Sequence, residues 1–367
     1  MPQEAQPRIL IYDTVTGRIS GGHQADYLVA LEAALAEFRP ETHAPFRDTS
    51  RPIPSIASRI LGSVSFFRHA LGATEKTLVL VPNPSSLDFV TFAVAAFFAL
   101  KNGRGSGVFV MRRDAAGIVG TGWRANILDR IVCWLAGGRF FHMVSDTRAA
   151  MDHWQARTGQ GGAIISIPVR LPTKSRPPGS PLSLGLIGLF RIEKGAAHYD
   201  AVIETTRALA PAWRIICQLS HTGRHPEEDR VARNLTAKWG ADPMVQIHAE
   251  HLDAEAFTDM LHDLDVVVLP YDIQTYGPGT SGILFEALAA GKVVLAAPIA
   301  WARQEYRDHP NVVWLNGTDN ATLREGLRQA LTRAEQRRGE TAETHRLPDR
   351  FRESWLEALV WISARPQ

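Results

Sequence analysis

The chain has 367 residues, enough for two domains that each bury a core of their own. Hydrophobic residues make up 45% and charged residues 21%, a balance that excludes a disordered or fibrous chain. With 40 basic and 38 acidic residues the net charge is only +2, so bulk charge predicts no nucleic-acid partner.

The most hydrophobic stretch, residues 89–100, has 12 residues, fewer than the ~20 that cross a bilayer. We expect it to form a buried helix. The polar N-terminal residues lead straight into an apolar run at 8–13, so no cleaved leader is expected. We therefore expect a cytoplasmic protein, with a place at the inner face of the cell membrane as a second option.

In the first half of the chain, short apolar runs alternate with longer amphipathic segments. The runs are typical of buried parallel strands and the segments of helices, so the alternation predicts a doubly wound α/β domain. We expect strands within 8–13, 77–85, 107–114 and 139–146, and helices within 17–38, 89–100, 123–137 and 147–158.

The proline-rich stretch 169–181 interrupts this pattern and reads as a linker. Alternation then restarts, with strands expected within 182–190, 213–221, 245–252, 265–272, 292–298 and 311–316, and helices within 199–210, 227–240, 254–264 and 321–338. We predict an N-terminal domain at 1–172, a linker at 173–181, a second domain at 182–345, and a C-terminal helix at 346–367 that packs back on the body.

Two glycine-rich turns of the second half each follow a predicted strand. In open α/β sheets ligands bind beyond the carboxyl ends of the strands, where helix N-termini favour an anion such as phosphate. In the first turn, "GLFRIEKG", Gly188 permits close backbone approach, and Arg191 and Lys194 are donors for phosphate oxygens. The alternative is a solvated loop in which Glu193 pairs with a neighbour.

The second turn, "YGPGTSGILFEALAAGK", leads into a helix. Gly282 frees the backbone, while Thr280 and Ser281 are able to cap the helix and donate to phosphate. Glu286 lies about a turn into the helix, where a carboxylate suits two vicinal hydroxyls such as those of a ribose. A capping or ion-pair role for Glu286 is the alternative.

As a pair, about 90 residues apart, these motifs resemble the retaining GT-B glycosyltransferases of family 4. The resemblance covers most of residues 180–330. It implies an α/β fold of two Rossmann-like domains facing a cleft, and a nucleotide-diphosphate sugar of UDP or GDP type as donor substrate, with no other cofactor.

The resemblance also implies roles for individual residues. Arg191 and Lys194 would neutralise the donor diphosphate and stabilise it as a leaving group, with Gly188 beside them, while Thr280, Ser281 and Gly282 would contact phosphate and Glu286 would hold the ribose. Gly21 and Gly22, in "SGGHQADYLVALEAAL", would close over the sugar phosphate, and His251 and Leu252 would lie where the base is read.

One position departs from the family pattern. The first glutamate of the E-x7-E pair falls at Pro278, and no acid occurs between Ile273 and Phe285; Asp272 is 14 residues upstream of Glu286. In the family that glutamate contacts the donor sugar. Its replacement therefore leaves the expected ribose and phosphate contacts intact, while recognition of the sugar stays open.

The first domain offers weaker candidates. His23 follows the glycine loop and is the catalytic candidate there, with helix capping as the alternative. Other polar candidates, each of a kind that is more often a cap or a surface residue than a catalyst, are Asp26, Asn83, Ser86, Asp88, His142 and Asp146. A retaining mechanism needs no enzyme nucleophile, since the donor phosphate takes the acceptor proton, whereas an inverting one would need a base from this domain.

Residues 51–72 mix basic side chains with an apolar face, which fits either peripheral membrane contact or packing on the domain itself. We predict a glycosyltransferase that uses a nucleotide sugar and a glycan or lipid-linked acceptor, with no metal because basic groups and helix N-termini replace it. The alternatives are a sugar-nucleotide epimerase or hydrolase, and a catalytically silent nucleotide-sugar-binding protein.

Overall fold

The structure is a computed structural model that describes residues 6–14, 23–44, 55–99, 103–112, 118–119, 122–170, 172, 176–177, 179–220, 226–276, 281–338 and 347–364; for 23–26 and 347–348 it describes the backbone alone. Contacts divide the chain into two compact units. One is Met1–Pro168 together with Pro348–Gln367, and the other is Val169–Leu347. The division thus falls at the start of the proline-rich stretch.

The first domain is built on a parallel sheet of six strands in the order β2-β1-β3-β4-β5-β6. The strands are β1 (Arg8–Tyr12), β2 (Glu41–His43), β3 (Thr77–Val81), β4 (Gly105–Val110), β5 (Phe141–Ser145) and β6 (Ala163–Ile164). The direction in which strands are added reverses between β1 and β3, so this is the switch point at which α/β sheets bind ligands.

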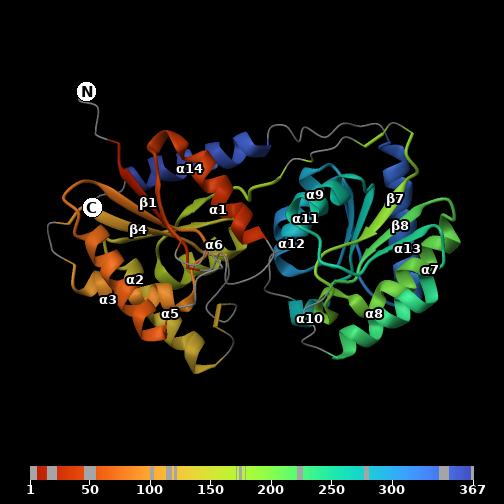
Figure 1. The fold of residues 1–367 in the computed structure, drawn as a ribbon, viewed down its shortest axis with the longest axis horizontal. Helices are drawn as coiled ribbons and strands as arrows, with labels where there is room; N and C mark the ends of the chain where they lie inside the picture. Colours follow the sequence, from red (N-terminus) through yellow and green to blue (C-terminus); the bar gives the residue numbers. More distant parts are fainter. Residues whose placement is uncertain are drawn as a thin grey trace. The chain divides into compact units, whose positions relative to one another are not determined.

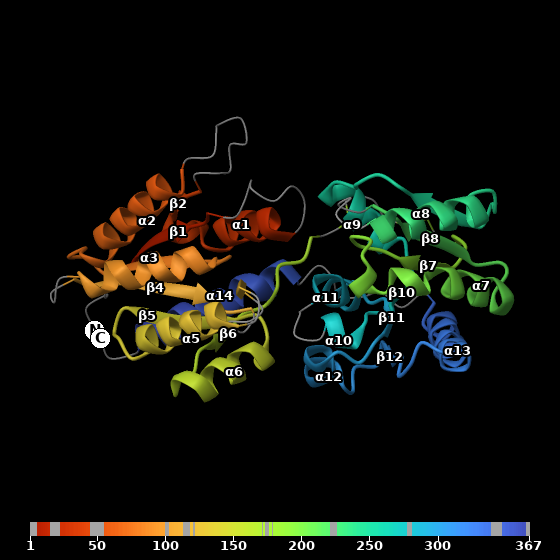
Figure 2. The same ribbon diagram turned by 90° about the horizontal axis from the view of Figure 1, so that it is seen from below.

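Helices cover both faces of this sheet, which explains why its central strands are apolar throughout (Figure 2). On one face lie α2 (Ile56–Leu71), α3 (Ser86–Phe97), α5 (Trp123–Ala136) and α6 (Arg148–Thr158). On the other lie α1 (His23–Ala34) and α14 (Leu347–Ser363), with the short helix η1 (Ala36–Phe38) after α1. Alternate residues of β1 therefore enter two separate cores, Tyr12 packing with the first layer and Ile11 with the second.

The C-terminal helix α14 belongs to the first domain although it follows the second in the chain (Figure 1). Phe351, Trp355 and Leu359 repeat at the spacing of one helical face and are buried against α1 and the first sheet. The Ser354 hydroxyl accepts a hydrogen bond from the Ser166 N–H at 2.9 Å, which ties the helix to the segment after β6.

The second domain has its own parallel sheet of six strands, in the order β12-β11-β10-β7-β8-β9. They are β7 (Ser183–Leu186), β8 (Arg214–Gln218), β9 (Val245–His248), β10 (Val266–Leu269), β11 (Val293–Ala296) and β12 (Val312–Trp314). After β9 the chain returns to the centre of the sheet, so the switch point lies between β7 and β10.

The helical segments of this domain are η2 (Ile192–Lys194), η3 (Ala196–His198), α7 (Tyr199–Leu209), α8 (Pro226–Trp239), α9 (Ala254–His262), α10 (Ile273–Tyr276), α11 (Gly282–Ala289), α12 (Ala300–Tyr306) and α13 (Asn320–Gln336). The doubly wound α/β architecture predicted from the sequence is confirmed in both domains. No helix in the described ranges is long and apolar enough to cross a membrane.

We expect Trp355→Ala to destabilise the first domain by about 3–5 kcal/mol, the usual cost of removing a fully buried aromatic side chain. Urea unfolding, monitored by the hydrogen exchange of amides in the first domain, measures the effect. Val360→Ala on the same helix is the control, because Val360 is 70% exposed. Equal stability of the two variants would contradict the buried position of Trp355.

Candidate donor-binding site

The loop after β7 is held in place by the end of the neighbouring strand β8. The Gly188 N–H donates to Gln218 Oε1 at 2.8 Å, and the Phe190 N–H donates to the Ser220 carbonyl at 2.8 Å. Gln218 is itself buried and donates from Nε2 to Ser220 Oγ at 3.2 Å. The Gly188 N–H is thus already paired and is not a free donor for phosphate. The prediction for Gly188 is therefore only that a phosphate approaches its backbone closely.

The same loop also packs against the loop after β10, across the switch point. Gly195 has φ +82°, and a Cβ on it would lie 1.9 Å from the Pro270 carbonyl oxygen. The Asp272 N–H donates to the Glu193 carbonyl at 3.1 Å. Only glycine combines this left-handed backbone with so close a neighbour.

Helix α11 begins at Gly282, and Ser281 is its N-cap. The buried Ser281 hydroxyl accepts from the Leu284 N–H at 3.2 Å and shares a hydrogen bond with the Tyr271 hydroxyl at 2.9 Å. Burial raises the pKa of Tyr271 well above its ordinary value, so this hydroxyl stays protonated. The predicted cap is present; donation from Ser281 to phosphate stays a prediction.

Gly188 is the point at which the two predicted motifs meet. Its φ is +106°, and a Cβ there would lie 2.2 Å from Ile283 Cδ1 in the first turn of α11 and 4.0 Å from Lys194 Nζ. The backbone of the β7 loop, the lysine ammonium and the start of α11 therefore lie within a few ångströms of one another.

Lys194 lies at this junction. Its pKa is lowered to about 8, mainly by burial and also by the nearby Arg191, while Glu193 opposes the change. Glu193 pairs instead with Arg191, Nη1 to Oε1 at 3.3 Å. Among the described residues no carboxylate lies within salt-bridge distance of Lys194 Nζ. A partly desolvated cation beside a helix N-terminus has the electrostatics of an anion site.

The Arg191 side chain is held by a weak ion pair. Its side chain is 42% exposed, and its pairing with Glu193 is a surface ion pair of the kind worth at most about 1 kcal/mol. The alternative considered for this loop, in which Glu193 pairs with a neighbour, thus holds for Arg191 and not for Lys194.

Glu286 lies on α11 one turn beyond its start and is half-buried. The N-cap of α11 is Ser281, and the capping or ion-pair alternative for Glu286 stays a prediction. Its contact with ribose stays a prediction. Asp272, the other acid near the motif, caps α10 by accepting from the Gln274 N–H at 2.8 Å.

The structure describes only some of the remaining predicted site residues. His251 and Leu252 follow β9, the edge strand, two strands away from β7. His23 is the first residue of α1, and its side chain is not described. Gly21, Gly22, Pro278 and Thr280 lie outside the described residues.

The first domain carries a second polar cluster at the carboxyl ends of its strands. Asn83, after β3, donates to Asp13 Oδ2 at 3.2 Å and accepts from Arg112 Nη1 at 3.0 Å. Arg112, after β4, pairs through Nε with Asp146 Oδ2 at 2.9 Å, and its guanidinium lies 4.2 Å from the centre of the Tyr27 ring.

Asp88 adjoins that cluster as a helix cap. Its Oδ2 accepts from the Ser85 N–H at 2.7 Å, and its Oδ1 accepts from the Thr14 hydroxyl at 3.0 Å. Burial raises its pKa in spite of these hydrogen bonds. The capping explanation given for Asp88 from the sequence is therefore correct.

Sequence reasoning missed Asp13, Thr14, Tyr27, Gln218 and Tyr271. Four of them share one signal, since Asp13, Thr14, Gln218 and Tyr271 are polar groups at or just after the end of an apolar strand. Within the described part of the chain, no three His, Cys, Asp or Glu side chains are grouped to hold a metal ion.

No protein-family model and no curated protein matches the sequence. Solved structures do resemble it. HepE of Anabaena, in complex with UDP, has 14% identity over 97% of each chain and a TM-score of 0.62. A Listeria monocytogenes protein assigned as a UDP-N-acetylglucosamine 2-epimerase has 14% identity over 99% of this chain and 98% of its own, with a TM-score of 0.63. A UDP-forming α,α-trehalose-phosphate synthase of Burkholderia xenovorans has 10% identity over 98% and 100%, with a TM-score of 0.65.

At such identities these similarities show the fold alone. They extend over nearly the whole of each chain, so both domains and their order are shared. The predicted fold class, two Rossmann-like domains of the GT-B type, is confirmed.

We expect Gly188→Ala to be more harmful than Gly122→Ala, because both glycines have a positive φ but only Gly188 has a neighbour within 4 Å of the added Cβ. Backbone strain costs about 1–3 kcal/mol at either position, and the contact with Ile283 adds a further ~1–3 kcal/mol at Gly188. Urea unfolding measures both. Because Ile283 is buried and its own loss is costly, the double variant Gly188→Ala, Ile283→Ala should lose less stability than the sum of the two single variants; an additive loss would contradict the contact.

Proposed function

We propose that this protein is a glycosyltransferase that transfers a sugar from a nucleotide-diphosphate sugar, of UDP or GDP type, to a glycan or lipid-linked acceptor. The observation that carries the proposal is the position of Lys194, half-buried, without an acidic partner among the described residues, and beside the first turn of α11. A diphosphate supplies the two negative charges that this position lacks.

In this proposal the donor lies over the switch point of the second sheet. The diphosphate faces Lys194 and the N-terminus of α11, and Arg191 leaves its weak pairing with Glu193 to join it. Glu286, further along the same helix, receives the ribose hydroxyls. Gly188 keeps the β7 loop free of a side chain at the place where the phosphates approach.

The similar structures support the choice of donor. HepE was solved with UDP and with UDP-glucose, and the Burkholderia enzyme is named for the UDP that it forms. We carry this donor class to the present chain because the cation and the helix N-terminus occur together in its second domain.

The reaction proposed is transfer with retention. The oxygen of the leaving phosphate accepts the proton of the acceptor hydroxyl, while Lys194 and Arg191 stabilise the charge that develops on the diphosphate. Catalysis then depends on positioning and electrostatics. The polar cluster around Asn83 and Arg112 in the first domain offers donors and acceptors of hydrogen bonds for the acceptor sugar.

A second candidate is a sugar-nucleotide epimerase or hydrolase with the same donor site, favoured by the likeness to the Listeria protein. A third is a silent binding protein, motivated by Pro278 in place of the family glutamate. Incubation of the purified protein with UDP- and GDP-sugars, with and without glycan acceptors, separates the three. Transfer, conversion or hydrolysis of the donor alone, and binding without turnover are their respective outcomes.

We expect Lys194→Ala and Glu286→Ala each to weaken donor binding by ~1–3 kcal/mol, the cost of a lost charged hydrogen bond. Calorimetric titration with UDP and GDP measures the change. Lys238→Ala is the control, since Lys238 is an exposed lysine of the same domain that pairs with Asp200 and Glu204. Unchanged affinity in both site variants would refute the assignment of the site.

The lowered pKa of Lys194 predicts a pH dependence of opposite sign for binding and for stability. The ammonium that binds phosphate loses its proton as pH rises through about 8, so UDP affinity should fall between pH 7 and pH 9. At pH 7 the buried charge costs stability, so Lys194→Met should raise the free energy of unfolding by ~1–3 kcal/mol while weakening UDP binding.

Thermal unfolding and UDP titration across this pH range test both statements. In Lys194→Met the affinity for UDP should no longer change with pH in this window. Loss of stability in Lys194→Met at pH 7, or an unchanged pH dependence of its UDP binding, would show that Lys194 is not a half-buried cation that binds an anion.

A further inference from the structure

The outward surface of the first domain's helical layer is unusually apolar. Helices α2, α3 and α5 turn one side toward the sheet, and each exposes large hydrophobic residues on its opposite side. We call this surface the exposed helix face. Its apolar members are Ile56, Ile60 and Leu61 of α2, Val90, Val94 and Phe97 of α3, and Trp123, Ile127 and Trp134 of α5.

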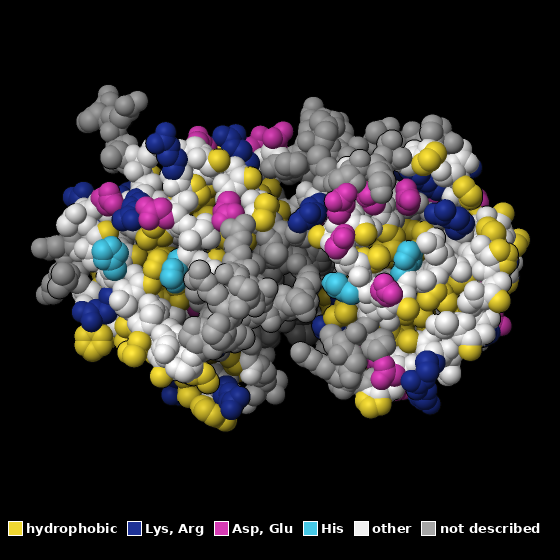
Figure 3. Space-filling model, in the orientation of Figure 1, with side chains coloured by type: hydrophobic (Ala, Val, Ile, Leu, Met, Phe, Trp, Pro, Cys, Tyr) yellow, Lys and Arg dark blue, Asp and Glu magenta, His cyan; other side chains and the backbone are white. Residues whose placement is uncertain are grey.

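These residues lie on one side of the molecule because the three helices form a single layer. α2 packs beside α3, and α3 beside α5 (Figure 2). Leu61 and Phe97 are each 71% exposed, and Trp123 is 69% exposed. In Figure 3, hydrophobic and basic side chains lie together along the lower edge of this domain, over α3 and α5.

The charges on the exposed helix face have one sign. Helix α2 contains no acid, the single acid of α3 is the buried Asp88, and the single acid of α5 is Asp129, which pairs with Arg157. The exposed bases are Arg68, Arg124 and Arg130. Among the described residues, neither Arg68 nor Arg130 has a carboxylate within salt-bridge distance.

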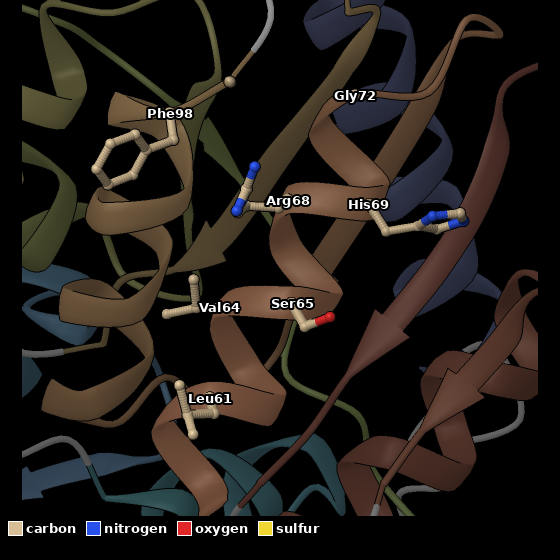
Figure 4. Close-up of a pocket in the computed structure, with 8 residues that line it drawn as sticks. Leu61, Val64, Ser65, Arg68, His69, Gly72 and Phe98 are labelled. Carbon is tan, nitrogen blue, oxygen red and sulfur yellow. The ribbon is translucent and has the colours of Figure 1, made fainter. Parts of the chain in front are cut away.

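A groove of about 460 Å³ runs between α2 and α3 on this face. Leu61 and Val64 line one wall, Phe98 lines the other, and Arg68 lies at the end of the groove nearest Phe98 (Figure 4). Ser65 and His69 also line it, so the groove joins apolar side chains to polar groups and a guanidinium, a combination that matches an acyl chain that ends in a phosphate.

We propose that the exposed helix face binds the surface of an anionic lipid bilayer, with Leu61, Phe97 and Trp123 entering the interface and Arg68 and Arg130 meeting lipid phosphates. Charge complementarity decides this occupant. A second copy of the chain would bring the same basic surface against itself, because a twofold interface pairs a patch with its own kind. An anionic bilayer supplies both the apolar interior and the opposite charge.

This inference goes beyond the proposed function and does not depend on the donor site. It describes a protein that lies on a membrane, since no helix in the described ranges is long enough to cross one. It would also place the first domain next to a lipid-linked acceptor.

Flotation of the full chain with vesicles tests the proposal. We expect binding to vesicles of equimolar phosphatidylcholine and phosphatidylglycerol, little binding to phosphatidylcholine alone, and weaker binding as salt rises. The triple variant Leu61→Gln, Phe97→Ser, Trp123→Ser should remain on the bottom of the gradient. Val360→Gln is its control, because Val360 is 70% exposed on α14, on the opposite face of the sheet.

The charge contribution has its own pair of variants. Arg68→Ala with Arg130→Ala should weaken binding to the anionic vesicles about 25-fold, roughly fivefold for each arginine near the surface. Arg324→Ala, an exposed arginine on α13 of the second domain, should leave it unchanged.

Three results would overturn the proposal. They are equal binding to neutral and anionic vesicles, unchanged binding in the triple variant, and a dimer in sedimentation that the triple variant dissolves, which would make a second copy the occupant. UDP titration of the same samples is expected to be unaffected. Failure at the membrane and failure of the donor site are thus separate outcomes.

Discussion

The contact between Gly188 and Ile283 is the constraint on which the candidate site depends. It brings the loop after β7 against the first turn of α11, and no side chain fits between them. The same approach leaves Lys194 beside the helix start, half-buried and without an acidic partner among the described residues. The hydrogen bond from Gly188 to Gln218 and the close packing of Gly195 on Pro270 keep the loop in this position. Backbone geometry thus places a partly desolvated cation beside the start of α11.

The two domains use the same architecture with different electrostatics. At the carboxyl ends of the first sheet, polar groups largely satisfy one another, as Asn83 does between Asp13 and Arg112. At the corresponding place in the second sheet, Glu193 pairs with Arg191, while burial and the nearby Arg191 lower the pKa of Lys194. Internal satisfaction makes a rigid surface for a neutral ligand, whereas a cation left over makes a site for an anion.

Local sequence patterns were sufficient to predict ten strands, most helices, the two glycine-rich turns and the Ser281 cap, but not the short edge strands β2 and β6 of the first sheet. Each of these depends on residues within one turn or one strand of one another. Gln218 and Tyr271 could not be found in this way, because their roles depend on partners from other loops. The role of Asp272 was missed for a different reason. Its carboxylate caps helix α10, whose four residues are too few to give a periodic sequence pattern. The apolar stripe of α14 predicted a packed helix but not that its partner would be α1.

The return of α14 to the first domain has a consequence for biosynthesis. A ribosome delivers the chain from the N-terminus, and domains generally fold as units in that order. Here the second domain, a continuous stretch, is complete before the first, because the core beneath α1 lacks Phe351 and Trp355 until α14 has been synthesised. During that interval the part of the first sheet that α14 covers in the folded domain stays exposed, which makes the nascent chain more prone to aggregation.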